Sequence, residues 1–396
     1  MKINKWLNGA IPAFLMHLSV GTIYAFSLFV KPLSAYMGYS EFQIQEAFSL
    51  AIFFLGMSAA FGGKIVETNI KKASRIGLIC FIGGLILTAI AVTNKSLWGL
   101  YLGYGVVHGI GLGITYLTPC KTVMLHFKEN KGFAIGLSVM GFGFASTFAA
   151  PIITNLLEFH INDIGKIFMD LALIYFIPMI FGVFLLKKPE GVELPETKNS
   201  FKYKKLLTDK FFLISWLMLF INIHCGLALI SIASPMMTEL GANAMLIALI
   251  ISVMGLCNGG GRIMFSTIAD YLSHRVFIYL TLFSLSIIAV YSYIVLPNIF
   301  TMGLMLCGIS AFFGAGFSNI APLLADKYGL TNVSKIHGVV LSAWAIAGLT
   351  GNSMSLFVHE LTGSYELIFS ILGALYTVGL LCVIYLCLNH KKIEMN

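Results

Sequence analysis

Apolar and polar positions follow a coarse, regular pattern along this chain, in which apolar runs of about 20 residues are separated by short polar segments. An α helix rises about 1.5 Å per residue, so each run is long enough to cross a hydrocarbon layer of about 30 Å. Helices are the expected structure there, because lipid offers backbone groups no hydrogen-bond partner. The pattern predicts twelve membrane-spanning helices over residues 6–30, 44–66, 74–93, 97–120, 133–157, 167–186, 211–238, 243–268, 276–295, 299–325, 335–359 and 364–388.

Composition supports the same class. Of the 396 residues, 58% are hydrophobic and 11% are charged, against about 25% charged in an ordinary soluble domain. No water-soluble fold could bury so much apolar surface. The seven cysteines form no CxxC pair and no Cys/His cluster with the spacing of a metal set, so we expect them to pack as small apolar residues and predict no metal and no cofactor. The predicted fold is an all-α integral membrane protein.

Positive charge indicates orientation rather than a nucleic-acid partner. The net charge is +8, but the lysines stand in short clusters between apolar runs. With a cytosolic N-terminus, every Lys and Arg except Lys31, Lys95, Lys166 and Arg262 falls on a cytosolic segment, as the positive-inside rule requires. We therefore expect both termini in the cytosol, the first helix retained as an anchor, and a multi-pass protein of a bacterial inner (cytoplasmic) membrane.

The longest polar stretch, KKPEGVELPETKNSFKYKKLLTDK, divides the chain. It is rich in lysine and contains two prolines, which is typical of a linker. We expect an N-terminal six-helix half over residues 1–186, a cytosolic linker over 187–210 and a C-terminal six-helix half over 211–396.

Several short sequences of the first half have a similar counterpart in the second half, about the same number of residues further along the chain. GITYLTP, ending at Pro119, matches GFSNIAP, ending at Pro322, at a shift of 203, and GLSVM matches VLSAW, ending at Trp344, at a shift of 204. The shift of 203 also takes Glu67 to Asp270. The matches predict a duplicated six-helix unit.

Two parallel repeats joined by a long cytosolic connection resemble the major facilitator superfamily, in which the substrate site lies between the halves near the midplane. GGKIVETNIKK and STIADYLSHR look like degenerate copies of the superfamily's Gly-x3-Asp-x2-Gly-Arg loop, with Glu67 and Asp270 in the acidic position. The resemblance implies that these acids cap and tether neighbouring helix ends. Their implied role is conformational.

Other segments are similar to the oxalate:formate antiporter family, namely GTIYAFSLFVKPL, GIGLGITYLTP, KGFAIGLSVMGFGFA and NGGGR. Related monocarboxylate transporters share the arginine of the eighth helix, here Arg262. An arginine about six residues, or about 9 Å, inside a span is costly and needs a partner. No Asp or Glu lies at comparable depth, so an anionic substrate is the natural counter-ion. Alternatively, Arg262 snorkels to the interface or pairs with helix-end carbonyls and Asp270.

The resemblance implies further site residues. Asn258 lies one turn before Arg262 on the same face, where monocarboxylate transporters carry an acid, so their proton-coupling route is in doubt here. Aromatic counterparts that line the cavity are Tyr24, Tyr116, Phe313, Phe317 and Trp344. The two tyrosines could donate to a carboxylate and the phenylalanines could form an apolar wall, although ordinary packing explains any one of them equally well.

Two further features concern specificity and coupling. Dicarboxylate exchangers that resemble this chain place a lysine in the eleventh helix, in the region of Trp344, and this chain has none there, which favours a monocarboxylate such as lactate, pyruvate or formate over oxalate. His17, His108 and His224 lie within spans, and a histidine there could carry a proton or bind the anion. Packing is the alternative for each.

The sequence thus predicts a carrier of a small organic anion that works by alternating access, as an exchanger with a counter-anion or as a proton symporter, and as a monomer in the lipid bilayer. A carrier of a dicarboxylate or a neutral solute, with Arg262 structural, is the main alternative. An enzyme would need a nucleophile, a metal set or paired carboxylates within the bilayer, and all 17 acids fall in loops or near helix ends. A membrane sensor would carry an added signalling domain.

Overall fold

The computed structural model describes residues 4–160, 163–193 and 203–389, and all regular structure within these ranges is helical. The N-terminal half comprises η1 (Trp6–Ala10), α1 (Ile11–Val20), η2 (Gly21–Ala25), α2 (Ser27–Met37), α3 (Glu41–Thr68), α4 (Ile70–Thr93), α5 (Leu97–Leu100), η3 (Tyr101–His108), α6 (Gly109–His126), α7 (Lys131–Phe159) and α8 (Ile164–Leu185). After α9 (Tyr203–Leu206), the second half comprises α10 (Lys210–Glu239), α11 (Ala244–Asp270), α12 (Val276–Val295), α13 (Ile299–Tyr328), α14 (Val333–Val340), α15 (Ser342–Thr362) and α16 (Glu366–Leu388).

These elements form the predicted twelve spans. Eleven helices in the described ranges are long and apolar enough to cross a membrane, and a bent pair, Trp6–Ala25 with Ser27–Met37, makes the twelfth. The fourth span continues to His126, beyond its predicted end at residue 120, because the helix runs through Pro119. The eleventh span is divided at Leu341 into α14 and α15.

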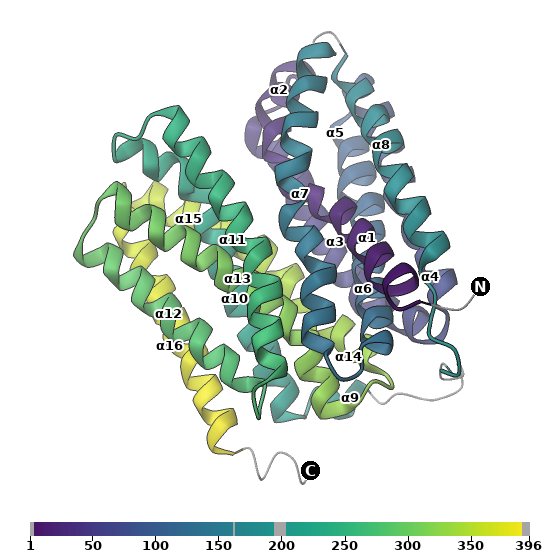
Figure 1. The fold of residues 1–396 in the computed structure, drawn as a ribbon. Coiled ribbons are helices and arrows are strands. Elements are labelled where there is room, and N and C mark those ends of the chain that lie inside the picture. Colours follow the sequence, from purple (N-terminus) through teal and green to yellow (C-terminus); the bar gives the residue numbers. More distant parts are fainter. Residues whose placement is uncertain (1–3, 161–162, 194–202, 390–396) are drawn as a thin grey trace.

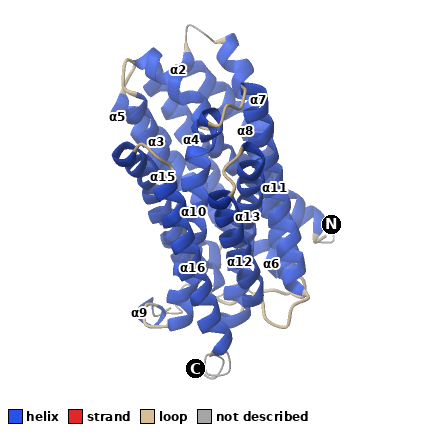
Figure 2. Cartoon of the chain, turned by 90° about the vertical axis from the view of Figure 1, so that its left-hand side faces the viewer, coloured by secondary structure: helices blue, strands red, loops and turns tan. Residues whose placement is uncertain are grey.

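The helices form two groups in the order of the sequence, α1–α8 and α10–α16 (Figure 1). The short helix α9, which lies between the two groups in the sequence, is found at the end of the bundle where α16 ends (Figure 2). We call this the linker end. Within the expected linker, residues 194–202 lie outside the described part of the chain.

Three main helix pairs join the two groups. α3 packs on α14 and α15, and α7 packs on α11. Glycines allow the backbones to approach closely: a Cβ at Gly63 would lie 2.5 Å from the carbonyl oxygen of Ser334, and one at Gly136 would lie 2.7 Å from that of Arg262. Small residues at helix interfaces are the usual means of close packing in membranes, and here they fix α11 against α7.

The outer face of the bundle is apolar. Large hydrophobic side chains are exposed on several helices, among them Trp98, Phe184, Leu304 and Leu388. Lipid chains solvate such residues, so this surface fits a membrane and leaves the polar side chains to the interior.

Candidate substrate-binding site

Arg262 lies on α11, eight residues or about 12 Å before the helix ends at Asp270. Its side chain is 1% exposed. Nε donates to Oδ1 of Asn258 at 2.9 Å, one turn earlier, which fixes the orientation of the guanidinium. Neither terminal nitrogen, Nη1 nor Nη2, has a hydrogen-bond partner among the described residues. Arg262 does not reach the linker end, and no described carboxylate pairs with it.

Two aromatic rings flank the guanidinium. Its central carbon lies 5.3 Å from the ring centre of Phe142 on α7 and 5.2 Å from that of Phe317 on α13. Such cation–π contacts stabilise a desolvated cation by about 2 kcal/mol. The contacts place Arg262 between the two halves, with its hydrogen-bonding edge free for another group.

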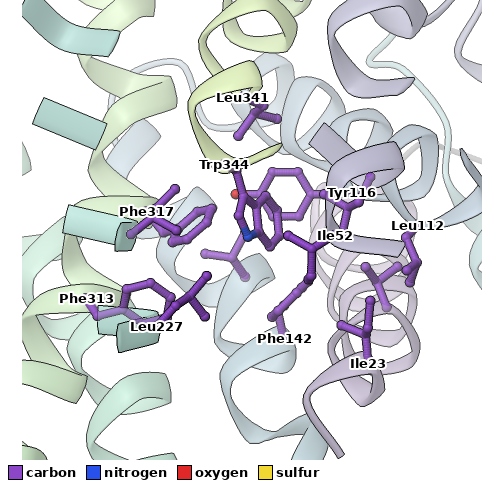
Figure 3. Packing of buried hydrophobic residues seen from close by; sticks show 14 of the residues in the cluster. Ile23, Ile52, Leu112, Tyr116, Phe142, Leu227, Phe313, Phe317, Leu341 and Trp344 are labelled. Carbon is purple, nitrogen blue, oxygen red and sulfur yellow. The ribbon is translucent and has the colours of Figure 1, made fainter. Parts of the chain in front are cut away.

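Tyr116 and Trp344 complete the surroundings of Arg262. Their ring centres lie 5.4 Å apart, and Trp344 also packs on Phe317 at 4.5 Å and on Phe142 at 5.6 Å. Figure 3 shows Trp344 between Phe317 and Tyr116. The hydroxyl of Tyr116 and Nε1 of Trp344 are buried and have no partner among the described residues.

Tyr24 contributes a further donor from the bend in the first span. It lies in the 3₁₀ segment η2, and its ring packs on Phe142 at 5.2 Å. Its hydroxyl is buried and unpartnered in the described structure. Gly21 allows this approach, because a Cβ there would lie 2.3 Å from the carbonyl oxygen of Phe142. We call Tyr24, Tyr116, Arg262 and Trp344 the Arg262 cluster.

The unpartnered groups of the Arg262 cluster are suited to binding an anion. Its unpartnered atoms are N–H and O–H groups, and leaving a buried polar group unpaired costs about 1–3 kcal/mol. An anion with several acceptor oxygens would satisfy these donors and neutralise the cation at once.

His17 lies beside the cluster and is fully hydrogen bonded. Its ring packs on Tyr116 at 5.1 Å, with Nδ1 2.8 Å from Oγ of Ser138 and Nε2 3.1 Å from the carbonyl oxygen of Tyr116. The Nε2–H tautomer satisfies both contacts, by donating to the carbonyl and accepting from the serine hydroxyl. His17 thereby holds Tyr116 in place.

The other residues expected at the site are distributed differently. Phe313 packs on Phe317 at 5.4 Å and extends the apolar wall. The described contacts of His108 are with Phe81 and Tyr104 inside the first half. Those of His224 are with Thr350 and Phe220 inside the second. The structure therefore brings neither of these two histidines to Arg262.

Sequence reasoning missed Phe142 and His337. Phe142 touches Arg262, Tyr24, Tyr116 and Trp344, but a phenylalanine in an apolar helix carries no signal of its own. His337 is 1% exposed, with its ring centre 6.1 Å from that of Tyr116. Its spacing of seven residues from Trp344, two helical turns on one face, could have pointed to it.

Glu67 joins the two halves at the linker end. Its fully buried carboxylate pairs with Lys121 at 2.5 Å and accepts from the backbone N–H groups of Asn332 at 3.1 Å and Ser334 at 3.0 Å. These groups form the start of α14, where a helix favours a negative charge. A side chain of the first half thus caps a helix of the second.

Asp270 makes the reciprocal contact. Its carboxylate accepts from the backbone N–H groups of Gly132 at 2.8 Å and Phe133 at 2.7 Å, at the start of α7. Arg275 pairs with it at 2.6 Å and also reaches Asp326 at 3.0 Å. Since Glu67 and Asp270 are related by the shift of 203, the two caps are equivalent positions of the two halves.

Among the described residues, no three His, Cys, Asp or Glu side chains gather closely enough to hold a metal ion.

The chain belongs to the Major Facilitator Superfamily, whose family model matches residues 13–352. Membership makes it a multi-pass membrane transporter and not an enzyme. Among similar proteins is the "Oxalate:formate antiporter" of Oxalobacter formigenes, 25% identical over 362 residues that cover 89% of this chain and 84% of the relative. "Monocarboxylate transporter 12" of Rattus norvegicus is 23% identical over 350 residues, 78% of this chain and 71% of the relative.

Solved structures support the same fold. The superfamily transporter FucP "in the outward conformation" superposes with a TM-score of 0.72 at 14% identity, covering 96% of this chain and 99% of that one. The proton:xylose symporter XylE gives 0.73 at 14%, covering 95% and 94%. The predicted fold of two six-helix halves is confirmed.

Proposed function

We propose that this transporter carries a small monocarboxylate, of the size of lactate, pyruvate or formate, bound between its halves at Arg262. The single observation that carries the proposal is the concentration of buried, unpartnered donors around one buried cation, in Arg262, Tyr24, Tyr116 and Trp344. A planar carboxylate matches the two parallel N–H groups of a guanidinium. The names of the similar proteins, which include oxalate, formate and monocarboxylates, support a small carboxylate as the cargo.

The count of buried cations favours one negative charge over two. Arg262 is the one described cation in contact with the aromatic rings of the site, and the eleventh span places Trp344 there. A second carboxylate would enter this apolar surrounding without a counter-charge, at a cost of several kcal/mol. A carrier of a neutral solute is less favoured, because the cation would then stay unneutralised.

Transport would proceed by alternating access around this site. The caps at Glu67 and Asp270 hold the halves together at the linker end, so the state described here is closed there. We propose that this end faces the cytosol of a bacterial cell, in line with the distribution of lysine and arginine. Trypsin added to inside-out vesicles, but not to right-side-out ones, should then cleave the lysine-rich linker.

The direct test of function uses purified protein in liposomes. Uptake of labelled lactate, pyruvate, formate and oxalate is measured by counterflow for the wild type and for Arg262→Gln, with folding of the variant checked by its cooperative melting. We expect counterflow of at least one monocarboxylate, and its loss in the variant. Equal transport by a folded Arg262→Gln protein, or transport of none of the three monocarboxylates, would refute the proposal.

A further inference from the structure

His337 is set apart from the other interior histidines by its lack of hydrogen bonds. Both of its ring nitrogens are shielded from solvent and have no partner among the described residues. His17, His108 and His224 each have a hydrogen-bonded ring nitrogen. Packing alone gives no reason for an imidazole at this position, since a polar ring buried without partners is unfavourable.

The position of His337 connects the two functional parts of the molecule. Toward the middle of the membrane, its ring faces Tyr116, and Trp344 follows two turns later on the same span. Toward the linker end, Ser334 lies one turn earlier and donates its backbone N–H to Glu67. His337 therefore lies between the Arg262 cluster and the contact that closes the linker end.

Most charged and titratable groups around α14 already have partners, but the buried hydroxyl of Tyr116 has none among the described residues and Lys64 on α3 is exposed. Tyr116 on α6 and His17 on α1 face the imidazole from the first half, and His17 is hydrogen bonded. Glu67 on α3 pairs with Lys121 on α6. On the helix itself, Lys335 donates to Oδ1 of Asn332 at 2.7 Å.

The second half offers no acceptor either. At the ends of α10 and α13 nearest to α14, Tyr328 donates to Asp209 at 2.8 Å. Within the described residues, then, no carboxylate accepts a hydrogen bond from His337. The neutral imidazole is the form that this state stabilises.

Anion binding changes that balance. A carboxylate at the Arg262 cluster adds a negative charge to a low-dielectric interior, where an added charge acts strongly on its neighbours. Protonation of a nearby imidazole then becomes more favourable. Because linkage is reciprocal, a proton on His337 strengthens anion binding by the same factor.

We propose that His337 is the proton-binding site of this carrier, so that one proton moves with one monocarboxylate. The inference rests on the proposed function. The proton adds to the lone pair of an imidazole nitrogen when the anion enters and returns to water when the anion leaves, with no other bond made or broken. The loaded site gains one positive and one negative charge, so transport is electroneutral.

Two assays in proteoliposomes test this. Counterflow without a pH gradient measures anion exchange, and uptake driven by an acid exterior measures coupling. The wild type should accumulate the anion about tenfold under a gradient of one pH unit. His337→Gln should retain at least about a tenth of wild-type counterflow, while its accumulation ratio falls to about one. His160→Gln, a histidine paired with Asp170 at the other end of the bundle, is the matched control and should accumulate the anion like the wild type.

The outcomes separate the two claims. If the wild type shows counterflow with none of lactate, pyruvate and formate, the proposed function is overturned. Counterflow with unchanged gradient-driven accumulation in His337→Gln overturns the role of His337 alone. If His337→Gln loses both activities, the number of protons taken up with each bound anion is measured on the wild type, by calorimetry in buffers of different ionisation enthalpy. We expect uptake of about one proton per anion. Uptake of none contradicts the proposal.

Discussion

Arg262 is held so that both its charge and its geometry are available to the proposed anion. Nε of Arg262 donates to Asn258, and the guanidinium lies over the rings of Phe142 and Phe317. Only the terminal nitrogens therefore remain to donate to a ligand. A lysine would keep the charge but lose both the two-pronged donor geometry and the stacking.

Arg262→Lys should therefore fold and bind anions weakly. Loss of one charge-assisted hydrogen bond costs about 1.5–3 kcal/mol, which is about a 10- to 100-fold weaker affinity. The concentration dependence of counterflow measures this as a raised half-saturation concentration. Unchanged affinity would mean that charge alone holds the substrate.

Trp344 should determine how many carboxylates the site accepts. Its indole N–H faces the same interior as Arg262 and carries no charge. Trp344→Lys adds a second cation there, so we expect the ratio of oxalate to monocarboxylate counterflow to rise about tenfold or more. Trp344→Phe, which removes the N–H without adding charge, is the control and should leave the ratio unaltered. If a folded Trp344→Lys protein shows an unchanged ratio of oxalate to monocarboxylate counterflow, position 344 does not determine how many carboxylates the site accepts.

Part of the candidate site could be predicted from the sequence, and part of it could not. Arg262 was predictable, because a buried cation without a sequence-local acid is rare and needs a partner. His108 and His224 share helical faces with plausible site residues, yet the structure packs them inside separate halves. Helical periodicity gives the face of one helix but not its neighbour, so only tertiary packing could distinguish these histidines from His337.

At the scale of elements, we expect the two helix caps to act as latches between the halves. Glu67 and Lys121 are both buried, and removing one partner of a buried pair costs about 3–5 kcal/mol. That pair lies within the first half, whereas the hydrogen bonds from the backbone N–H groups of Asn332 and Ser334 to Glu67 cross between the halves. Each hydrogen bond to a charged group contributes about 1.5–3 kcal/mol, and these two form only while the linker end is shut.

Glu67→Gln should therefore shift the carrier toward opening at the linker end. Cys120 is buried on α6, one turn from Tyr116 toward that end, so its alkylation rate reports opening. We expect peptide-resolved mass spectrometry to show faster labelling of Cys120 by N-ethylmaleimide in the variant, with Cys225 on the second half as the internal reference. Equal labelling of Cys120 in both proteins would argue against a latch.

The bend of the first span depends on close packing at Gly21. A Cβ there would meet the backbone of α7 at 2.3 Å, so Gly21→Ala should displace Tyr24 and cost about 1–3 kcal/mol. Gly83→Ala on α4 has no atom within 4 Å of the added carbon and should be neutral or slightly stabilising. Melting temperatures in detergent compare the two, and an equal effect would show that the approach at Gly21 is not tight.

At the scale of the whole molecule, twelve spans and two halves were predictable because lipid leaves few alternatives to apolar helices. The offset of about 203 residues also anticipated the equivalence of Glu67 and Asp270, which occupy matching positions at the ends of α14 and α7. The bends in the first and eleventh spans were not predictable, since hydropathy reports length and not direction. Both bends lie beside the Arg262 cluster, where broken helices commonly form transporter sites.

The central claim is that Arg262 binds a carboxylate between the two halves. Titration calorimetry of the purified protein with lactate, pyruvate and formate, for wild type and Arg262→Gln, measures this without any assumption about coupling. The account predicts saturable binding of at least one anion to the wild type and no detectable binding to a variant that still melts cooperatively. Equal binding to both proteins would contradict it.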